Sequence, residues 1–331
     1  MNHFVNLPYI SFSLLAIKKE NRIGFIKENN KYLYVDYLHI DISDLENSIS
    51  LEEIRIYKRL SKVPLDVHIA KKNPLLVLNR IELSKNDKCC VHIENNLKKN
   101  IIKKFMNKFK LGMAINIETP TYKLKKYVKY LDYILFMSAT PGVSGLGFND
   151  KVISKIRYFK KKNSEICVHA DGGVNNVNAA LLREEKVDVI ISGSYLIKDK
   201  SIKKQLSLLL GGNYFKNIHY YSSKKIPKLN IKSKIIDALK KIDKYKMGIV
   251  LVFEKNKLKG LISDGDIRRY LIKKGSIYDE TYNVINEKMI KLKNTSLIHS
   301  LREIKNIKNI SAIPIMDKKE KCISIFRGLI K

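Results

Sequence analysis

The sequence predicts an α/β fold, in which a (β/α)8 TIM-type barrel is followed by a smaller α+β domain. Eight short apolar runs of β type begin about twenty to thirty residues apart, which is the repeat of parallel strands with crossover helices. Lysine-rich amphipathic segments lie between these runs. The first run lacks the Gly-rich turn that a doubly wound sheet would need, so the barrel is favoured.

The predicted strands follow one another through the first two thirds of the chain. They cover residues 7–15, 32–42, 64–70, 88–94, 111–117, 133–139, 165–171 and 187–194. Two of the helical segments between them, 94–110 and 149–163, place apolar residues on one face and lysines on the other. We expect the barrel domain to span residues 1–211.

Gly211 and Gly212 mark the predicted start of a second domain, residues 212–331. There the pattern predicts a helix at 233–246, strands at 248–254 and 258–263, and a helix at 264–275. A weaker copy follows, with a helix at 296–307 and strands at 311–316 and 322–326. This internal repeat of about sixty residues predicts a paired module.

The formal net charge of +32 arises mostly from lysines scattered over the whole length. Without arginine clusters interleaved with aromatic residues, this charge does not predict specific nucleic-acid binding, and it favours a looser attraction to phosphorylated or acidic partners. The four cysteines form no CxxC pair, which indicates a reducing compartment. No targeting segment and no run of 18 apolar residues is present, so we expect a cytoplasmic protein without a membrane partner.

Polar side chains gather at the carboxyl ends of the predicted strands, where a (β/α)8 enzyme has its active site. A lone histidine or a single Asp-Gly-Gly turn is usually structural, but polar residues at the same end of successive strands favour a common site. Imidazoles together with carboxylates suit Zn, Fe(II), Mn or Co better than Ca or Mg. The residues concerned are His39, Asp41, His68, His92, Glu94, Met137 and Asp171.

Seven ordered motifs resemble the ribulose-phosphate 3-epimerase family over nearly all of residues 7–197. They read "LHIDISD", "LDVHIAKKNP", "VHIENN", "MAINIETP", "YILFMSATPGVSGLGF", "HADGGVNNVNAALL" and "VDVIISGSYLI". The resemblance implies that His39, Asp41, His68 and Asp171 hold one divalent cation. It also implies that Asp41 and Asp171 are the catalytic acid–base pair. The reaction expected is inversion at C3 of a ketose phosphate through an enediolate that the cation stabilises.

Backbone N–H groups in glycine-containing loops are expected to bind the substrate's phosphate. Such loops follow the last three predicted strands of the barrel, and the last two are the usual phosphate corner of this fold. These glycines can also be simple turns. Ser13 matches the serine of the family's first-strand motif. The predicted substrate- and phosphate-binding residues are Ser13, Met137, Gly142, Gly145, Gly172, Gly173, Gly193 and Ser194.

The chain departs from the family pattern around the sugar. Ser43 and Ala70 stand where relatives have methionines, and Leu45 stands where they have a glycine. Thr140 replaces a glutamate, and Ser144 replaces a glycine. These changes predict a related but different sugar phosphate, a pentulose, hexulose or heptulose phosphate. Together with the resemblance of the second domain described next, to CBS pairs that accompany sugar-phosphate isomerases and sugar nucleotidyltransferases, they imply a surface-polysaccharide pathway instead of the pentose phosphate pathway.

The segment "LVFEKNKLKGLISDGDIRRYL" resembles a CBS domain, which makes residues 212–331 a CBS domain pair by resemblance. The family's Ser/Thr-x-x-Asp element is matched by Ser263 and Asp266, which implies an adenine nucleotide such as AMP or ATP at the start of the last helix. The second copy lacks this element, so one site is expected. The pair can equally serve to assemble a homo-oligomer.

The sequence therefore predicts a metal-dependent isomerase that acts on a carbohydrate phosphate. Two other classes remain open. One is a non-catalytic nucleotide-sensing scaffold on a degenerate barrel, which would bind no metal and tolerate Asp41→Asn. The other is a related sugar-phosphate isomerase or lyase, which would bind metal but not restrict proton exchange to C3.

Overall fold

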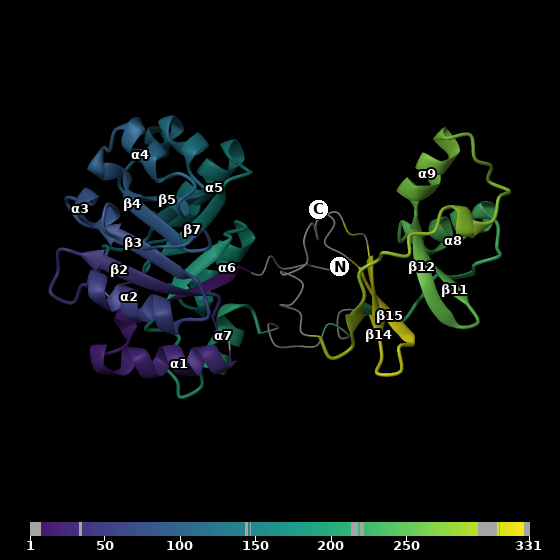
Figure 1. Cartoon of the computed structure of the whole chain (residues 1–331), viewed down its shortest axis with the longest axis horizontal. Helices are drawn as coiled ribbons and strands as arrows, with labels where there is room; N and C mark the ends of the chain where they lie inside the picture. Colours follow the sequence, from purple (N-terminus) through teal and green to yellow (C-terminus); the bar gives the residue numbers. More distant parts are fainter. Residues whose placement is uncertain are drawn as a thin grey trace. The chain divides into compact units, whose positions relative to one another are not determined.

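The computed structural model describes residues 8–32, 35–142, 145, 147–212, 218, 222–296, 310 and 312–327. The chain divides into two compact units, Met1–Gly212 and Asn213–Lys331 (Figure 1). Each unit has its own strands and its own buried apolar residues, and each is described below by itself.

Eight parallel strands close into a barrel in the first unit, which confirms the predicted fold class. The ring closes where Tyr9–Phe12 pair with Val189–Ser192. The strands are β1 (Tyr9–Ser13), β2 (Tyr37–Ser43), β3 (Leu65–Ala70), β4 (Lys88–His92), β5 (Lys110–Ile115), β6 (Tyr133–Met137), β7 (Cys167–Asp171) and β8 (Val189–Ser192).

Helices cover the outside of the barrel (Figure 1). They are α1 (Arg22–Tyr32), α2 (Leu51–Leu60), α3 (Leu75–Leu78), α4 (Lys99–Phe105), α5 (Lys151–Lys162), α6 (Asn176–Glu184) and α7 (Ile202–Leu209). The connection from β5 to β6 instead uses 3-10 helices, Thr121–Lys126 and Val128–Tyr130, after Pro120. A capping box between Ser50 and Glu53 begins α2.

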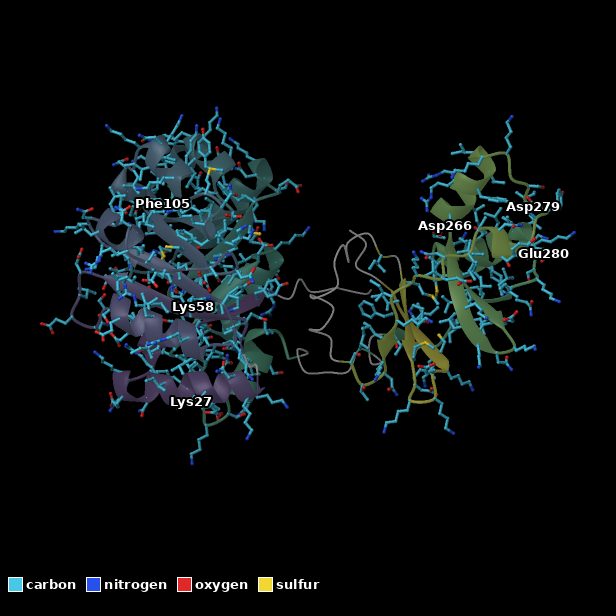
Figure 2. All side chains as sticks on the ribbon, in the orientation of Figure 1. Lys27, Lys58, Phe105, Asp266, Asp279 and Glu280 are labelled. Atoms are coloured by element: carbon cyan, nitrogen blue, oxygen red, sulfur yellow. The ribbon has the colours of Figure 1, made fainter. Side chains whose placement is uncertain are left out.

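The apolar core lies between the strands and the helices. Phe12 of β1 stacks on Phe25 of α1 with ring centroids 4.2 Å apart, and Phe136 of β6 meets Phe159 of α5 at 5.4 Å. Burying each such ring contributes about 1.5–3 kcal/mol. Lysines occupy the outer helix faces, as Lys27 does on α1 (Figure 2).

The inside of the barrel is polar as well as buried. Along β3, Val67 and Ile69 alternate with Asp66 and His68, and all four are buried. Successive residues of a strand point to opposite faces, so the apolar pair packs on the helices while the polar pair enters the barrel. The strand sequence thereby places titratable groups in the interior.

The second unit contains two sheets built on the same plan. β10 (Lys228–Asn230) pairs parallel with β11 (Ile249–Glu254), which pairs antiparallel with β12 (Lys257–Ser263). In the other sheet β13 (Leu292–Lys293), β14 (Ala312–Met316) and β15 (Cys322–Arg327) repeat this pattern, and β9 (Ser222–Ser223) adds to β15. The predicted internal repeat is therefore present in the strands.

Two helices accompany the first sheet, α8 (Ile235–Tyr245) and α9 (Asp264–Ile272). The hairpin between β11 and β12 turns at Lys255 and Asn256, whose φ angles are 44° and 65°. The helix predicted at 296–307 lies, apart from Ser296, outside the described residues. Across both units, no helix among the described residues combines the length and the apolar character needed to span a bilayer.

Candidate active site

Strand register brings the predicted ligands to one end of the barrel. His39 lies beside Ser13 of β1, Asp41 lies beside His68 of β3, and Asp171 lies beside Met137 of β6. The spacing of two residues points His39 and Asp41 to the same side of β2. Since all eight strands are parallel, these side chains meet at the carboxyl end of the barrel.

The side chains of His39, Asp41, His68 and Asp171 form one group, in which the ligand atoms all lie within 4.8 Å of one another. Asp41 Oδ1 lies 3.4 Å from His39 Nε2 and 3.1 Å from His68 Nδ1. Asp171 Oδ2 lies 3.8 Å from His39 Nε2. The two histidines are fully buried, whereas the Asp171 side chain retains 17% exposure. The group is therefore shielded from solvent on the side of the two histidines and accessible to solvent beside Asp171.

The hydrogen bonding of His39 suits a cation in this group. His39 Nδ1 lies 3.3 Å from Asp66 Oδ2, an oxygen that also accepts a hydrogen bond from Ser11. A carboxylate only accepts, so the proton of a neutral His39 belongs on Nδ1 and the lone pair on Nε2. Nε2 is buried and has no hydrogen-bond partner among the described residues. This donor set fits Zn, Fe(II), Mn or Co.

The charges of the group also favour a cation. Burial lowers the pKa of His39, but the Asp41 and Asp66 carboxylates outweigh burial and raise it well above its usual value. A field that favours a proton on this imidazole equally favours a metal ion beside it. The carboxylates that create the field are themselves held in the ionised form.

The two carboxylates of the group titrate differently. Burial raises the pKa of Asp41, but His39 and His68 outweigh it and bring this pKa well below its usual range. For Asp171, burial together with the charge of Asp41 outweighs His39 and raises the pKa to about 6. Carboxyl groups whose pKa values are pushed apart in this way suit opposite roles in proton transfer.

Three further residues surround the group, and sequence reasoning gave two of them no role and missed the third. His92 Nε2 lies 2.7 Å from His68 Nε2, and His92 Nδ1 lies 3.1 Å from Glu94 Oε2. Burial raises the pKa of Glu94, yet bonds from His92 and Thr119 hold it at about 2. His92 and Glu94 were recognised at the end of their strand without a role. Asp66 was missed, although its spacing of two from His68 places both on one face.

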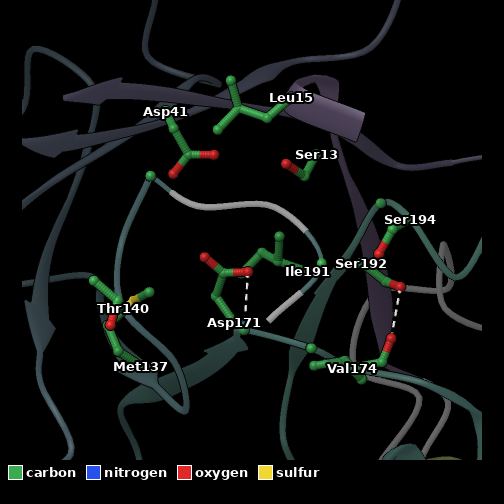
Figure 3. A pocket seen from close by; sticks show the side chains of 15 residues that line it. Ser13, Leu15, Asp41, Met137, Thr140, Asp171, Val174, Ile191, Ser192 and Ser194 are labelled. Carbon is green, nitrogen blue, oxygen red and sulfur yellow. Dashed lines mark hydrogen bonds between the residues drawn. The ribbon is translucent and has the colours of Figure 1, made fainter. Parts of the chain in front are cut away.

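A pocket opens above the group. Figure 3 shows Asp41 and Asp171 facing its interior, with Leu15 and Ile191 adding apolar surface. The pocket is lined by every predicted substrate-binding residue, namely Ser13, Met137, Gly142, Gly145, Gly172, Gly173, Gly193 and Ser194, together with Thr140, Val174 and Ser192.

Glycine is required where the pocket loops turn. Gly172 and Gly173 have φ angles of 104° and 61°, a region that side chains disfavour. At Gly193 a Cβ atom would lie 2.8 Å from Ala16 Cβ and 2.9 Å from the Ser13 carbonyl oxygen. The backbone after β7 and β8 is thus exposed to the pocket without side chains in the way.

In the second unit, Ser263 and Asp266 lie together at the start of α9. Ser263 caps the helix by accepting from the Asp266 N–H, while Asp266 Oδ2 accepts from the Ser263 N–H and hydroxyl at 2.9 and 2.6 Å. Arg269 donates to Asp266 Oδ1 at 2.6 Å. Both carboxylate oxygens are therefore engaged, one by Ser263 at the start of α9 and the other by Arg269 one turn further along the helix.

Comparison with known proteins identifies relatives for both parts of the chain. A family model described as "Ribulose-phosphate 3 epimerase family" matches residues 9–197, and a CBS domain model matches residues 218–273. Both resemblances expected from the motifs are thus confirmed.

Curated proteins named ribulose-phosphate 3-epimerase are similar to the barrel. The Helicobacter pylori protein is 28% identical over 190 residues, which cover 54% of this chain and 86% of the relative. The Aquifex aeolicus protein is 30% identical over 181 residues, covering 51% and 81%. Among solved structures, a CBS domain pair/ACT domain protein from Thermotoga maritima is 9% identical, with a TM-score of 0.29, and covers 34% of this chain and 88% of that one.

Proposed function

Because the chain belongs to the ribulose-phosphate 3-epimerase family, we propose that this epimerase-like enzyme inverts C3 of a ketose phosphate. One observation carries the proposal: the carboxylates of Asp41 and Asp171 converge, with two imidazoles, on one point below a pocket. Ribulose 5-phosphate is the first substrate to test, since the relatives are named for a ribulose phosphate.

A single divalent cation, Zn, Fe(II), Mn or Co, would be held by His39, Asp41, His68 and Asp171. When bound, it supplies Lewis-acid stabilisation to the charge that develops on the substrate's oxygens when C3 loses its proton. The buried Nε2 of His39, which has no hydrogen-bond partner within the part of the chain that the structure describes, supports this assignment.

Asp41 and Asp171 are proposed as the acid–base pair. Inversion of a carbon centre requires one group to remove the proton from one face and another to deliver a proton to the opposite face. The low pKa of Asp41 keeps its carboxylate ionised and free to accept a proton, and a pKa of about 6 lets Asp171 hold a proton more readily. For the reverse reaction the two exchange roles.

The substrate's phosphate is proposed to lie against the loops after β7 and β8. There Gly172, Gly173, Gly193 and Ser194 bring backbone N–H groups to the pocket, which suits an anion. Ser13, Met137, Gly142 and Gly145 line the remaining wall. Thr140, a departure from the family pattern, also lines the pocket, which favours a sugar other than the family's usual one.

For the second unit we propose a CBS pair over residues 212–331 that binds an adenine nucleotide such as AMP or ATP through Ser263 and Asp266. The family match over residues 218–273 supports the domain assignment. The alternative role is assembly of a homo-oligomer. In that role Asp266 would keep its present hydrogen bonds, whereas a bound ribose would have to replace at least one of them.

The direct test is an epimerase assay on protein of known metal content. The compounds offered would be a pentulose 5-phosphate, a hexulose 6-phosphate and a heptulose 7-phosphate, each compared with its unphosphorylated ketose. NMR would detect formation of the C3 epimer. We expect one phosphate ester to react, its unphosphorylated form to react poorly, and Asp171→Asn to be inactive. Cleavage products or an aldose would identify the related lyase or isomerase instead. No metal and no reaction would favour the scaffold.

A further inference from the structure

A row of three side chains runs outward from Asp41 on the side of β3 and β4. His68 Nδ1 faces Asp41 Oδ1 at 3.1 Å, and His68 Nε2 faces His92 Nε2 at 2.7 Å. His92 Nδ1 faces Glu94 Oε2 at 3.1 Å. His68 is fully buried, and His92 nearly so. Each imidazole therefore has one neighbour on each of its two ring nitrogens.

The outer end of the row determines where the protons lie. Glu94 Oε1 accepts the Asn116 N–H at 3.1 Å and the Thr119 hydroxyl, which leaves Oε2 for His92. A carboxylate offers no proton, so His92 carries its own proton on Nδ1. Its Nε2 then has a lone pair and accepts the Nε2–H of His68. The lone pair of His68 is thereby placed on Nδ1, facing Asp41.

The loop that supports Glu94 is itself anchored. Lys155 of α5 donates to the carbonyl oxygens of Asn116 and Ile117, at 2.5 and 3.1 Å. This holds the segment whose N–H and hydroxyl groups bind Glu94. The orientation of His68 is therefore fixed through contacts with two further elements of the barrel, the loop after β5 and helix α5.

We propose that Glu94 and His92 are positioning residues that fix the tautomer and orientation of His68 for binding a divalent cation through Nδ1. This inference rests on the proposed metal site. A lone pair 3.1 Å from the Asp41 carboxylate is unfavourable unless a cation or a proton lies near both atoms. Asp66 acts in the same way on His39, through Nδ1, so both imidazoles present acceptors to one point.

The test measures cobalt binding and histidine tautomers, without an activity assay. Co²⁺ affinity would be determined by competition with a chelator for the full-length wild type, Glu94→Gln and His92→Leu. Glu118→Gln is the matched control, because Glu118 is an exposed carboxylate on the loop after β5 whose Asn116 and Thr119 bind Glu94. Long-range ¹H–¹⁵N NMR of zinc-loaded protein would report which ring nitrogen of His68 is protonated.

We expect the Glu94 and His92 variants to bind Co²⁺ about 10–100-fold more weakly, as for other supporting partners of metal-bound histidines, with Glu118→Gln unchanged. The wild type should show His68 protonated at Nε2. Glu94→Gln preserves size, so it remains informative if His92→Leu fails to fold. Equal affinities with an unchanged tautomer would overturn the inference and leave the proposed function standing. A wild type that binds no cobalt or zinc would overturn both.

Discussion

His39 Nε2 lies 3.8 Å from Asp171 Oδ2, although β2 and β7 do not pair with each other. Closure of the sheet between β1 and β8 brings the two side chains together at the carboxyl end of the barrel. Because the site is assembled from strands that are not neighbours, it forms only when the whole barrel is closed. Its chemistry should therefore be tested by single substitutions in the intact chain.

Removal of either carboxylate should abolish epimerisation. Asp41→Asn and Asp171→Asn each remove one half of the acid–base pair, and we expect losses of kcat of about 10²–10⁴-fold. Steady-state kinetics with whichever ketose phosphate reacts in the epimerase assay would measure this. Glu82→Gln, at an exposed position outside the pocket lining, serves as a control that should retain most activity. Full activity in Asp41→Asn would contradict the assignment.

A side chain at Gly193 should weaken substrate binding. In Gly193→Ala the added methyl would meet Ala16 Cβ at 2.8 Å and the Ser13 carbonyl oxygen at 2.9 Å, so the loop after β8 must shift. We expect KM for the phosphate ester to rise about tenfold or more, the effect of losing about 1.4 kcal/mol of binding. Gly24→Ala is the matched control, because nothing lies within 4 Å of its added methyl. An unchanged KM would place the phosphate elsewhere.

Asp87 should contribute stability that depends on pH. Its Oδ1 accepts from Lys58 Nζ at 2.7 Å and from the Leu65 N–H at 2.9 Å, and Lys58 is labelled in Figure 2. Burial raises the pKa of Asp87, but these bonds and those from Ser84 outweigh burial and lower it. A lowered pKa contributes stability above the unfolded pKa near 4, and this contribution is lost as the pH falls through the folded pKa.

We therefore expect Asp87→Asn to lower the free energy of unfolding by about 1–3 kcal/mol at pH 7 and by much less at pH 3. Urea denaturation at the two pH values would measure the difference. Glu82→Gln is the control, since Glu82 forms an exposed ion pair with Arg55 and should change stability by less than about 1 kcal/mol. The same loss for Asp87→Asn at both pH values would show that its charge is not involved.

Nucleotide binding to the second unit should be limited by Arg269. A ribose that binds Asp266 must compete with the Arg269 guanidinium for Oδ1. Arg269→Met should therefore tighten AMP binding by up to about fivefold, because an exposed pair contributes at most about 1 kcal/mol. Asp266→Asn should weaken it, and Arg268→Met is the control. Calorimetry that detects no AMP binding by any form would favour assembly as the role of this unit.

The fold was predictable because every barrel strand carries its own local signal. Buried runs such as 133–137 are continuous in apolar residues, and the lysine-rich segments that follow are amphipathic. The exception is the connection from β5 to β6, which forms 3-10 helices instead of the α-helix of the other crossovers. Its start after Pro120 is visible in the sequence, but its hydrogen-bond type depends on the packing of the finished barrel.

The candidate site was only partly predictable. Their places at strand ends predicted that His39, Asp41, His68 and Asp171 lie near one another, because parallel strands bring those ends together. The family resemblance then singled out these four as the ligands. Asp66 lies two residues before His68 in β3, further from the carboxyl end of the strand. Its contact with His39 depends on the register between β2 and β3, and that register is a property of the folded sheet.

The measurement that tests the central claim most directly is deuterium exchange at C3. The metal-loaded enzyme would be mixed with ribulose 5-phosphate, then with the other ketose phosphates, in D2O and followed by NMR. The account predicts that deuterium enters at C3 alone, that the epimer appears, and that both are lost in Asp171→Asn. Epimer formation without solvent deuterium, or exchange that persists in Asp171→Asn, would contradict proton transfer by the Asp41–Asp171 pair.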